Sequence, residues 1–200
     1  MPRVLTQTDV ADFRERLCET ATKMFDARGR EGFTMRELAS ELGVSAMTPY
    51  RYFKDKDDIL AAVRARAFNR WADSLEAAFA GAKSAPEKSA AVYQAYIRFA
   101  FGEPAAYRLM FDLSQPDESQ YPELVAAGER ARATMTDYVR ELVKASILEG
   151  DPELIGRVFW ASLHGAVVLK LAGKLGGDAY DFDRVSGEAF RLLFEGYRKK

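Results

Sequence analysis

Apolar residues recur every three or four positions along almost the whole chain, the spacing that places them on one face of an α-helix. Between residues 9 and 28 they fall at Val10, Phe13, Leu17, Ala21, Met24 and Phe25. One face of residues 56–80 repeats the pattern with Ile59, Leu60, Val63, Ala67, Trp71 and Leu75. No pair of segments has the two-residue alternation and tight turn of a β-hairpin. The pattern predicts an all-α protein.

Prolines mark several helix starts in the second half, because proline fits the first helical turn and disrupts the interior. Together with the periodicity they predict helices over residues 86–101, 104–113, 122–149, 153–172 and 183–197. Gly150, Asp151 and Pro152 combine a helix stop, an N-cap and a first-turn proline. With the N-terminal elements, about nine helices are expected.

A segment near the N-terminus has the signals of two short helices joined by a tight turn. Thr34 can cap the N–H of Glu37 while the Glu37 carboxylate caps Thr34 in return, which starts a helix. Gly43 ends it, and Ser45 is placed to cap a second helix over about residues 46–53. Two short helices around a glycine turn form a helix-turn-helix, whose second helix enters the major groove of DNA. The alternative is a compact three-helix core that binds nothing.

Composition and charge limit the function classes. Of the 200 residues 48% are hydrophobic and 30% charged, the balance of a soluble globular protein. The formal net charge is −1, so any DNA affinity must come from a local arrangement of charge. One cysteine and no export signal indicate a cytoplasmic protein. The longest apolar run, residues 158–169, is too short to span a bilayer, so no membrane partner is expected.

Motifs for catalysis are not found. The glycine-rich residues 173–177 lack the spacing of a phosphate-binding loop. His164 is the only histidine and Cys18 the only cysteine, and their separation gives no metal-ligand spacing. We therefore expect no enzyme activity, no metal and no cofactor.

The sequences FTMRELA (33–39), GVS (43–45), YRYF (50–53) and KDDIL (56–60) resemble the DNA-binding domain of TetR/AcrR-family repressors, over about residues 10–60. The resemblance implies DNA contacts from Thr34, Arg36, Ser45, Ala46, Met47, Thr48, Tyr50, Arg51, Tyr52 and Lys56. Most members have leucine where this chain has Pro49. Because proline removes the first intrahelical bond, to the Ser45 carbonyl, an irregular first turn is expected in the second helix.

The second half carries a weaker resemblance. Residues 103–111 and the Trp160 to Gly165 segment resemble a TetR-type regulatory domain named for a Trp-His-Gly motif, which implies ligand binding and dimerisation. Candidate ligand-binding residues are Tyr96, Phe99, Tyr107, Met110, Phe111, Met135, Trp160 and His164. His164 can equally be a core packing residue. The last two helices are expected to form the homodimer interface, with an intrachain pair as the alternative.

These features divide the chain into a helix-turn-helix domain (residues 9–55), a connecting helix (56–80) and a ligand-binding and dimerisation domain (81–200). The expected function is a transcriptional repressor that binds a (pseudo)palindromic operator as a dimer. A small, largely apolar effector is expected to release it from the operator DNA. A helical sensor or carrier that binds no DNA is the alternative from another class, and an activator or nucleoid-type binder would use the same motif.

Overall fold

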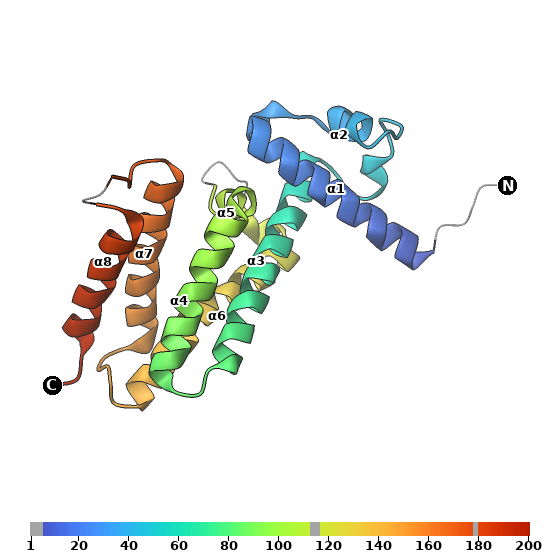
Figure 1. The fold of residues 1–200 in the computed structure, drawn as a ribbon. Coiled ribbons are helices and arrows are strands. Elements are labelled where there is room, and N and C mark those ends of the chain that lie inside the picture. The colour runs from blue at the N-terminus through green and yellow to red at the C-terminus, as the bar shows by residue number, and fades with distance from the viewer. Residues whose placement is uncertain (1–5, 113–116, 178–179) are drawn as a thin grey trace. The chain divides into compact units, whose positions relative to one another are not determined.

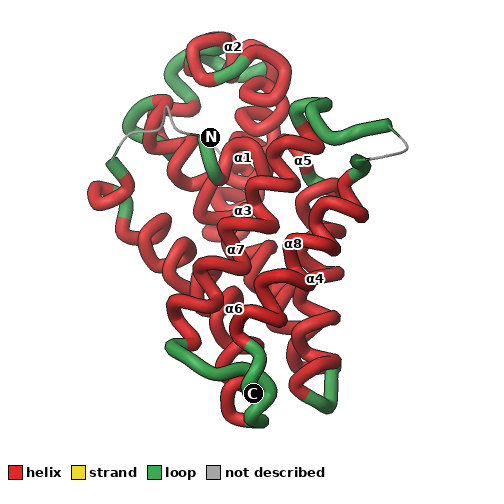
Figure 2. The backbone as a smooth tube through the Cα atoms, turned by 90° about the vertical axis from the view of Figure 1, so that its left-hand side faces the viewer, coloured by secondary structure: helices red, strands yellow, loops and turns green. Residues whose placement is uncertain are grey.

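The computed structural model describes residues 6–112, 117–177 and 180–200, which hold eight α-helices and no β-strand (Figure 1 and Figure 2). The helices are α1 (Gln7–Arg28), α2 (Met35–Glu41), α3 (Lys56–Gly81), α4 (Ala85–Gly102), α5 (Pro104–Met110), α6 (Pro122–Lys144), α7 (Pro152–Leu171) and α8 (Phe182–Tyr197). Short 3-10 turns are η1 (Arg30–Gly32), η2 (Pro49–Arg51) and η3 (Glu118–Gln120). The predicted all-α class is confirmed, with one α-helix fewer than expected.

Local hydrogen bonds explain where the helices begin. α1, α2 and α4 each start with a reciprocal capping box, in which the cap hydroxyl accepts from the third helical N–H and an acidic side chain bonds back. The α2 box joins Thr34 and Glu37, as the sequence predicted. Gly150 has φ of 132°, and the Asp151 carboxylate caps α7 just before Pro152. The helix start read from Asp151 and Pro152 is confirmed. The helix stop at Gly150 is wrong, because α6 already ends at Lys144, where Ser146 adopts φ of 58° and the Ile147 N–H donates back to the Leu142 carbonyl over 2.9 Å.

The described residues form two compact units. Unit 1 comprises the chain up to Asn69 together with Ala105–Gly128, and unit 2 comprises Arg70–Pro104 and Glu129–Lys200. The single helix α3 contributes its first half to unit 1 and its second half to unit 2. The domain boundaries expected near residues 55 and 80 stay predictions.

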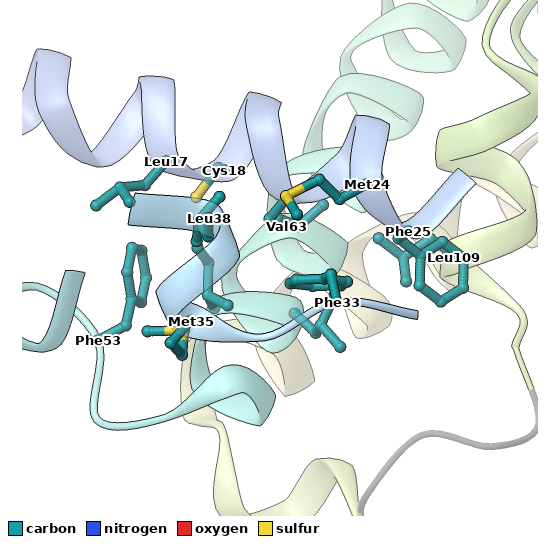
Figure 3. Packing of buried hydrophobic residues seen from close by; sticks show 13 residues of the cluster. Leu17, Cys18, Met24, Phe25, Phe33, Met35, Leu38, Phe53, Val63 and Leu109 are labelled. Atoms are coloured by element: carbon teal, nitrogen blue, oxygen red, sulfur yellow. The ribbon is translucent and has the colours of Figure 1, made fainter. Parts of the chain in front are cut away.

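Unit 1 is built around one apolar cluster, whose members come from α1, α2, the start of α3, and α5 (Figure 3). Its buried side chains include Leu17, Cys18, Met24, Phe33, Leu38, Phe53, Ile59, Leu60, Val63 and Leu109. In Figure 3 these side chains converge between the helices from both sides. This cluster fixes the positions of α2 and the segment that follows it.

Unit 2 packs the end of α3 with α4, α6, α7 and α8. The Trp71 ring meets Tyr96 edge-on with centroids 4.4 Å apart, and Phe99 at 5.4 Å. Gly156 lets α7 approach α6 closely, because a Cβ there would lie 2.8 Å from the Met135 carbonyl oxygen. α7 and α8 lie side by side (Figure 1).

The outer faces of α7 and α8 are unusually apolar for a surface. Leu154, Val168, Leu169 and Leu192 are all exposed. Among the described helices, α7 alone is long and apolar enough to cross a membrane on length and composition, and 28% of its apolar window is buried. A soluble helix with an apolar interaction face satisfies the same criterion, so this is weak support for a membrane span. On the opposite side of α7, Gly156, Ala166 and Val167 are buried within the chain.

Candidate DNA interface and ligand cavity

The turn after α2 has the hydrogen bonds of a Schellman motif. Gly43 adopts φ of 65°, the left-handed region that favours glycine. Its N–H donates to the Ser40 carbonyl over 3.0 Å, and the Val44 N–H donates to the Ala39 carbonyl over 3.0 Å. The chain therefore reverses sharply after a helix of seven residues, as a helix-turn-helix requires.

The α-helix expected over residues 46–53 is absent, and the single 3-10 turn η2 takes its place. Pro49 has no N–H, so the Ser45 carbonyl accepts from the Thr48 N–H instead, over 2.9 Å. The same i to i+3 pattern continues between Arg51 and Thr48 at 3.1 Å. The irregularity expected for the first turn thus extends through most of the element, which changes the direction of each side chain on it.

Most side chains expected to contact DNA are on the surface. Met47 is 69% exposed and Tyr50 48% exposed, two large side chains that a purely structural role would bury. Residues that are also exposed are Thr34, Arg36, Ser45, Ala46 and Arg51. Thr48, Tyr52 and Lys56 are half-buried. The exposed set spans the start of α2 and the second element, so both are accessible to DNA.

Contacts with α1 hold the second element in place. The Tyr52 ring lies 5.0 Å from the Phe13 ring, and the Arg14 guanidinium donates to the Tyr52 carbonyl over 3.3 Å. The same guanidinium stacks 4.5 Å from the centre of the buried Phe53 ring. Tyr52 therefore anchors the segment while Tyr50 points outward from it.

Lys56 occupies a structural position at the start of α3. Its ammonium donates to the carbonyls of Arg30 over 2.8 Å and Phe33 over 3.4 Å. The Asp55 carboxylate accepts the Asp58 N–H over 2.9 Å, so that helix-start donor is also occupied. These bonds tie α3 to the chain before α2. A phosphate contact from Lys56 stays a prediction and requires one of these bonds to be exchanged.

Three other cations are available to a phosphate or a base. Arg36, Arg51 and Lys54 are exposed, and no carboxylate pairs with them among the described residues. Arg36 and Arg51 were predicted to contact DNA, whereas Lys54 was not. Its place in the local run of positive charge between Arg51 and Lys56 was the available signal.

Arg64 is a buried cation that the sequence gave no reason to single out. It lies on α3 at 4% exposure, donates to the Met110 carbonyl over 3.1 Å and pairs with Glu118. It therefore joins α3 to the end of α5 and to η3 within unit 1.

A half-open groove of about 340 Å³ lies between α4 and α8 in unit 2, with Leu142 of α6 in its wall. Its other lining residues are Pro86, Ser89, Ala90, Tyr93, Gln94, Gly187, Phe190 and Phe194. Behind it is a cavity of about 30 Å³ lined by Ser89, Val92, Tyr93, Tyr96, Met135, Tyr138, Phe159, Trp160, Leu163 and Phe190. The two spaces share Ser89, Tyr93 and Phe190 in their linings, so they are adjacent, and together we call them the α4–α8 pocket.

The α4–α8 pocket includes three of the eight residues expected to bind ligand, namely Tyr96, Met135 and Trp160. Phe99 packs against Trp71, while Tyr107, Met110 and Phe111 belong to unit 1. Tyr93, Tyr138 and Phe190 line the pocket and were not selected. Their spacing beside Tyr96 and Met135 on the same helices could have indicated two of them.

His164 is half-buried on α7, its ring centre 5.8 Å from that of Trp160. Burial lowers its pKa from the usual 6.5, because the charged imidazolium is the form that desolvation penalises. It is outside the lining of the α4–α8 pocket.

A second pocket, between α6 and α7, is polar. It has a volume of about 320 Å³ and is lined by Glu129, Arg132, Ala133, Met135, Thr136, Arg140, Glu153, Arg157 and Trp160. Arg140 is paired with Asp137 and Glu153, whereas Arg132 and Arg157 have no ionic partner among the described residues. Across residues 6–112, 117–177 and 180–200, no group of three or more His, Cys, Asp or Glu side chains is placed to hold a metal ion.

These features define a helix-turn-helix protein. A capped helix, a glycine turn and an exposed second element share one buried core. Residues 17–63 match the family model described as bacterial regulatory proteins, tetR family. Residues 89–194, more than half of the chain, match the model described as Tetracyclin repressor-like, C-terminal domain. The chain belongs to the TetR family of transcriptional regulators. The narrower assignment to the Trp-His-Gly type stays a prediction.

Relatives agree with this family. An uncharacterized HTH-type transcriptional regulator of Mycobacterium tuberculosis is 26% identical over 188 residues, 94% of this chain and 82% of the relative. An HTH-type transcriptional regulator of Staphylococcus aureus is 43% identical over 61 residues, which span only 33% of that relative. A solved structure of a protein with unknown function from Rhodococcus sp. RHA1 is 27% identical and superposes with a TM-score of 0.80 over 99% of both chains.

Proposed function

We propose that this protein is a cytoplasmic transcriptional repressor that binds a (pseudo)palindromic operator as a homodimer and leaves it when a small, largely apolar effector binds. The observation that carries the proposal is the exposure of Met47, Tyr50 and Arg51 on a segment whose other large side chains are anchored in the unit 1 core. Exposed apolar, hydroxyl and guanidinium groups together can read base edges in the major groove.

Backbone contacts come from the exposed cations around the motif. Arg36 on α2 and Lys54 after η2 can each neutralise a phosphate, and phosphate contacts set the position of a protein on the duplex. The chain as a whole supplies no attraction to DNA, since its net charge is −1. A second subunit doubles the number of these local contacts, and a twofold protein matches a twofold operator.

Dimerisation through α7 and α8 is supported by their exposed apolar face. Leu154, Val168, Leu169 and Leu192 are the large residues of that face, and Ala161 and Gly165 leave room for close approach between helices. Monomeric proteins rarely leave such a face in water.

Release by an effector is supported by the α4–α8 pocket and by the continuity of α3. α3 is one uninterrupted helix that starts directly after the DNA-reading segment and ends in unit 2. An effector that binds unit 2 and turns α3 would alter the spacing of the two half-site readers in the dimer. Allosteric coupling of about 1–3 kcal/mol would weaken operator binding roughly 5- to 150-fold.

DNase footprinting of the region upstream of the protein's own gene tests the proposal. We expect two protected half-sites whose centres lie roughly 34–36 Å apart, or a multiple of that, related by a twofold axis. The dimer should be visible in analytical ultracentrifugation without DNA. Protection without symmetry, or no preference over random DNA, would contradict the proposal, and transcription with and without the protein separates a repressor from an activator.

A further inference from the structure

The α4–α8 pocket has no charged side chain in either of its two parts. A bound carboxylate or ammonium would therefore lose its hydration without gaining an ionic partner, which is strongly unfavourable. The contrast with the polar α6–α7 pocket is clear, since that one is lined by Arg132, Arg140 and Arg157. The lining of the α4–α8 pocket favours a neutral occupant.

The walls of the pocket favour a flat ring. The Tyr93 and Phe190 rings are tilted by 52° with centroids 6.1 Å apart, and the Phe190 ring lies 5.3 Å from the Phe159 ring at 53°. The Tyr93 hydroxyl bonds to the Ser186 hydroxyl over 3.1 Å, which holds this wall between α4 and α8. Rings at these separations accept a further aromatic group in an edge-on or offset arrangement. The groove volume of about 340 Å³ is within the range of small-molecule sites.

The inner cavity holds an unused hydrogen-bonding group. Tyr138 is 8% exposed and lines this cavity, and no described residue bonds to its hydroxyl. Burial raises the pKa of Tyr138, so its phenol keeps its proton at neutral pH and can donate as well as accept. A phenol that lines a cavity can supply a ligand with one directional hydrogen bond. The cavity of about 30 Å³ has room for a hydroxyl-sized group and not for a ring.

We infer that the effector is an uncharged aromatic compound with a hydroxyl-type polar group, its ring in the groove between α4 and α8 and its polar group on Tyr138. This inference rests on the proposed function and specifies its ligand. Ser89, Tyr93 and Phe190 line both spaces, so the ring and the polar group of one ligand would lie against the same three side chains.

Isothermal titration calorimetry at pH 7 with 2-naphthol and 2-naphthoate tests the inference, because the two probes share a ring system and differ in charge. We expect the neutral 2-naphthol to bind at least tenfold more tightly than the anion. Tyr138→Phe should weaken 2-naphthol binding about three- to tenfold, the effect of losing one hydrogen bond, and Tyr121→Phe should have no effect. Tyr121 is a matched tyrosine in unit 1.

A second variant keeps the test independent of Tyr138. A side chain at Gly187 would meet no atom within 4 Å, so Gly187→Leu fills the groove while leaving the fold intact, and it should abolish 2-naphthol binding. Equal or tighter binding of 2-naphthoate that is lost in Arg157→Gln would overturn the inference and place the effector in the α6–α7 pocket. Absence of binding by either probe would also overturn it. The operator footprint uses no effector, so its outcome separates failure of this inference from failure of the proposed function.

Discussion

The Thr48 N–H donates to the Ser45 carbonyl over 2.9 Å, and this carbonyl is the acceptor that residue 49 would use in an α-helix. The cause is Pro49, which has no N–H and is buried. The element that we propose to read DNA is therefore a 3-10 turn, with its side chains spaced differently from those of an α-helix.

Replacing the proline tests the consequence of this geometry. Pro49→Leu restores the N–H, and we expect an α-helical turn to form and to re-aim Met47 and Tyr50. Discrimination between operator and random DNA should then change by tenfold or more, with little change in affinity for random DNA. Competition binding with both DNAs measures this ratio. An unchanged ratio would show that the 3-10 turn has no part in sequence recognition.

Lys54 and Lys56 should behave differently despite being two residues apart. Lys54→Ala removes an exposed cation, so we expect weaker binding to all DNA and a salt slope reduced by about one. Lys56→Ala removes the donor to the Arg30 and Phe33 carbonyls and should lower the free energy of unfolding by roughly 1–3 kcal/mol. Urea denaturation and salt titration of each variant separate the two roles. A reduced salt slope without loss of stability in Lys56→Ala would assign that ammonium to phosphate binding.

Arg64 should be a major contributor to the stability of unit 1. Arg64→Ala leaves the Met110 carbonyl and Glu118 without their partner, and we expect a loss of about 2–4 kcal/mol in the free energy of unfolding. Arg108→Ala is the matched control, because Arg108 forms an exposed ion pair with Asp26 worth at most about 1 kcal/mol. A similar decrease in the free energy of unfolding in both variants would show that burial does not increase the contribution of Arg64 to stability.

Two glycines on α7 should respond oppositely to alanine. Gly156→Ala places a Cβ 2.8 Å from the Met135 carbonyl oxygen and should destabilise the chain by roughly 1–3 kcal/mol. Gly165→Ala meets no atom within 4 Å and gains helix propensity of about 0.5–1 kcal/mol. If α7 packs tightly on a partner subunit, Gly165→Ala should weaken the dimer, which sedimentation measures. A dimer unaffected by Gly165→Ala and by Val168→Asp would place the interface elsewhere.

The single histidine gives stability a pH dependence. The folded-state pKa of His164 lies below its usual 6.5, so the unfolded chain binds this proton more readily. The stabilising contribution is complete above pH 6.5 and is lost as the pH falls through the folded pKa. Thermal unfolding between pH 7.5 and 5.5 should show a drop in Tm that is smaller in His164→Gln. An identical pH profile in the variant would exclude His164 as the source.

Much of the fold followed from local signals in the sequence. The Thr34 and Glu37 capping box, the Gly43 turn and the apolar face of α3 all act between residues close in the chain, and all were predicted. The sequence also identified Pro49 as a departure from the family. It did not predict that the missing N–H of Pro49 would replace the expected α-helix with a 3-10 turn. That outcome depends on which N–H groups the neighbouring carbonyls accept instead.

The roles of several core and site residues could not be predicted, because they depend on contacts between residues that are distant in the sequence. In the sequence, Arg64 is one of several charged residues on a helix. Its burial results from contacts with Met110 and Glu118, which are more than 40 positions away in the chain. Aromatic side chains are abundant in the second half, and only packing decides that Tyr93 and Tyr138 line the pocket while Phe99 packs on Trp71. Lys56 matched a family pattern for DNA contact, yet its ammonium bonds to two carbonyls of its own chain.

Sequence-specific DNA binding is tested most directly by a salt titration of binding to operator and random DNA, measured by fluorescence anisotropy on the intact protein. We expect the protein to bind DNA from its own promoter region at least about 10³-fold more tightly than random DNA. Loss of the exposed guanidinium in Arg51→Ala should reduce that ratio by tenfold or more. Equal affinity for the two DNAs at every salt concentration would contradict sequence-specific regulation by this helix-turn-helix.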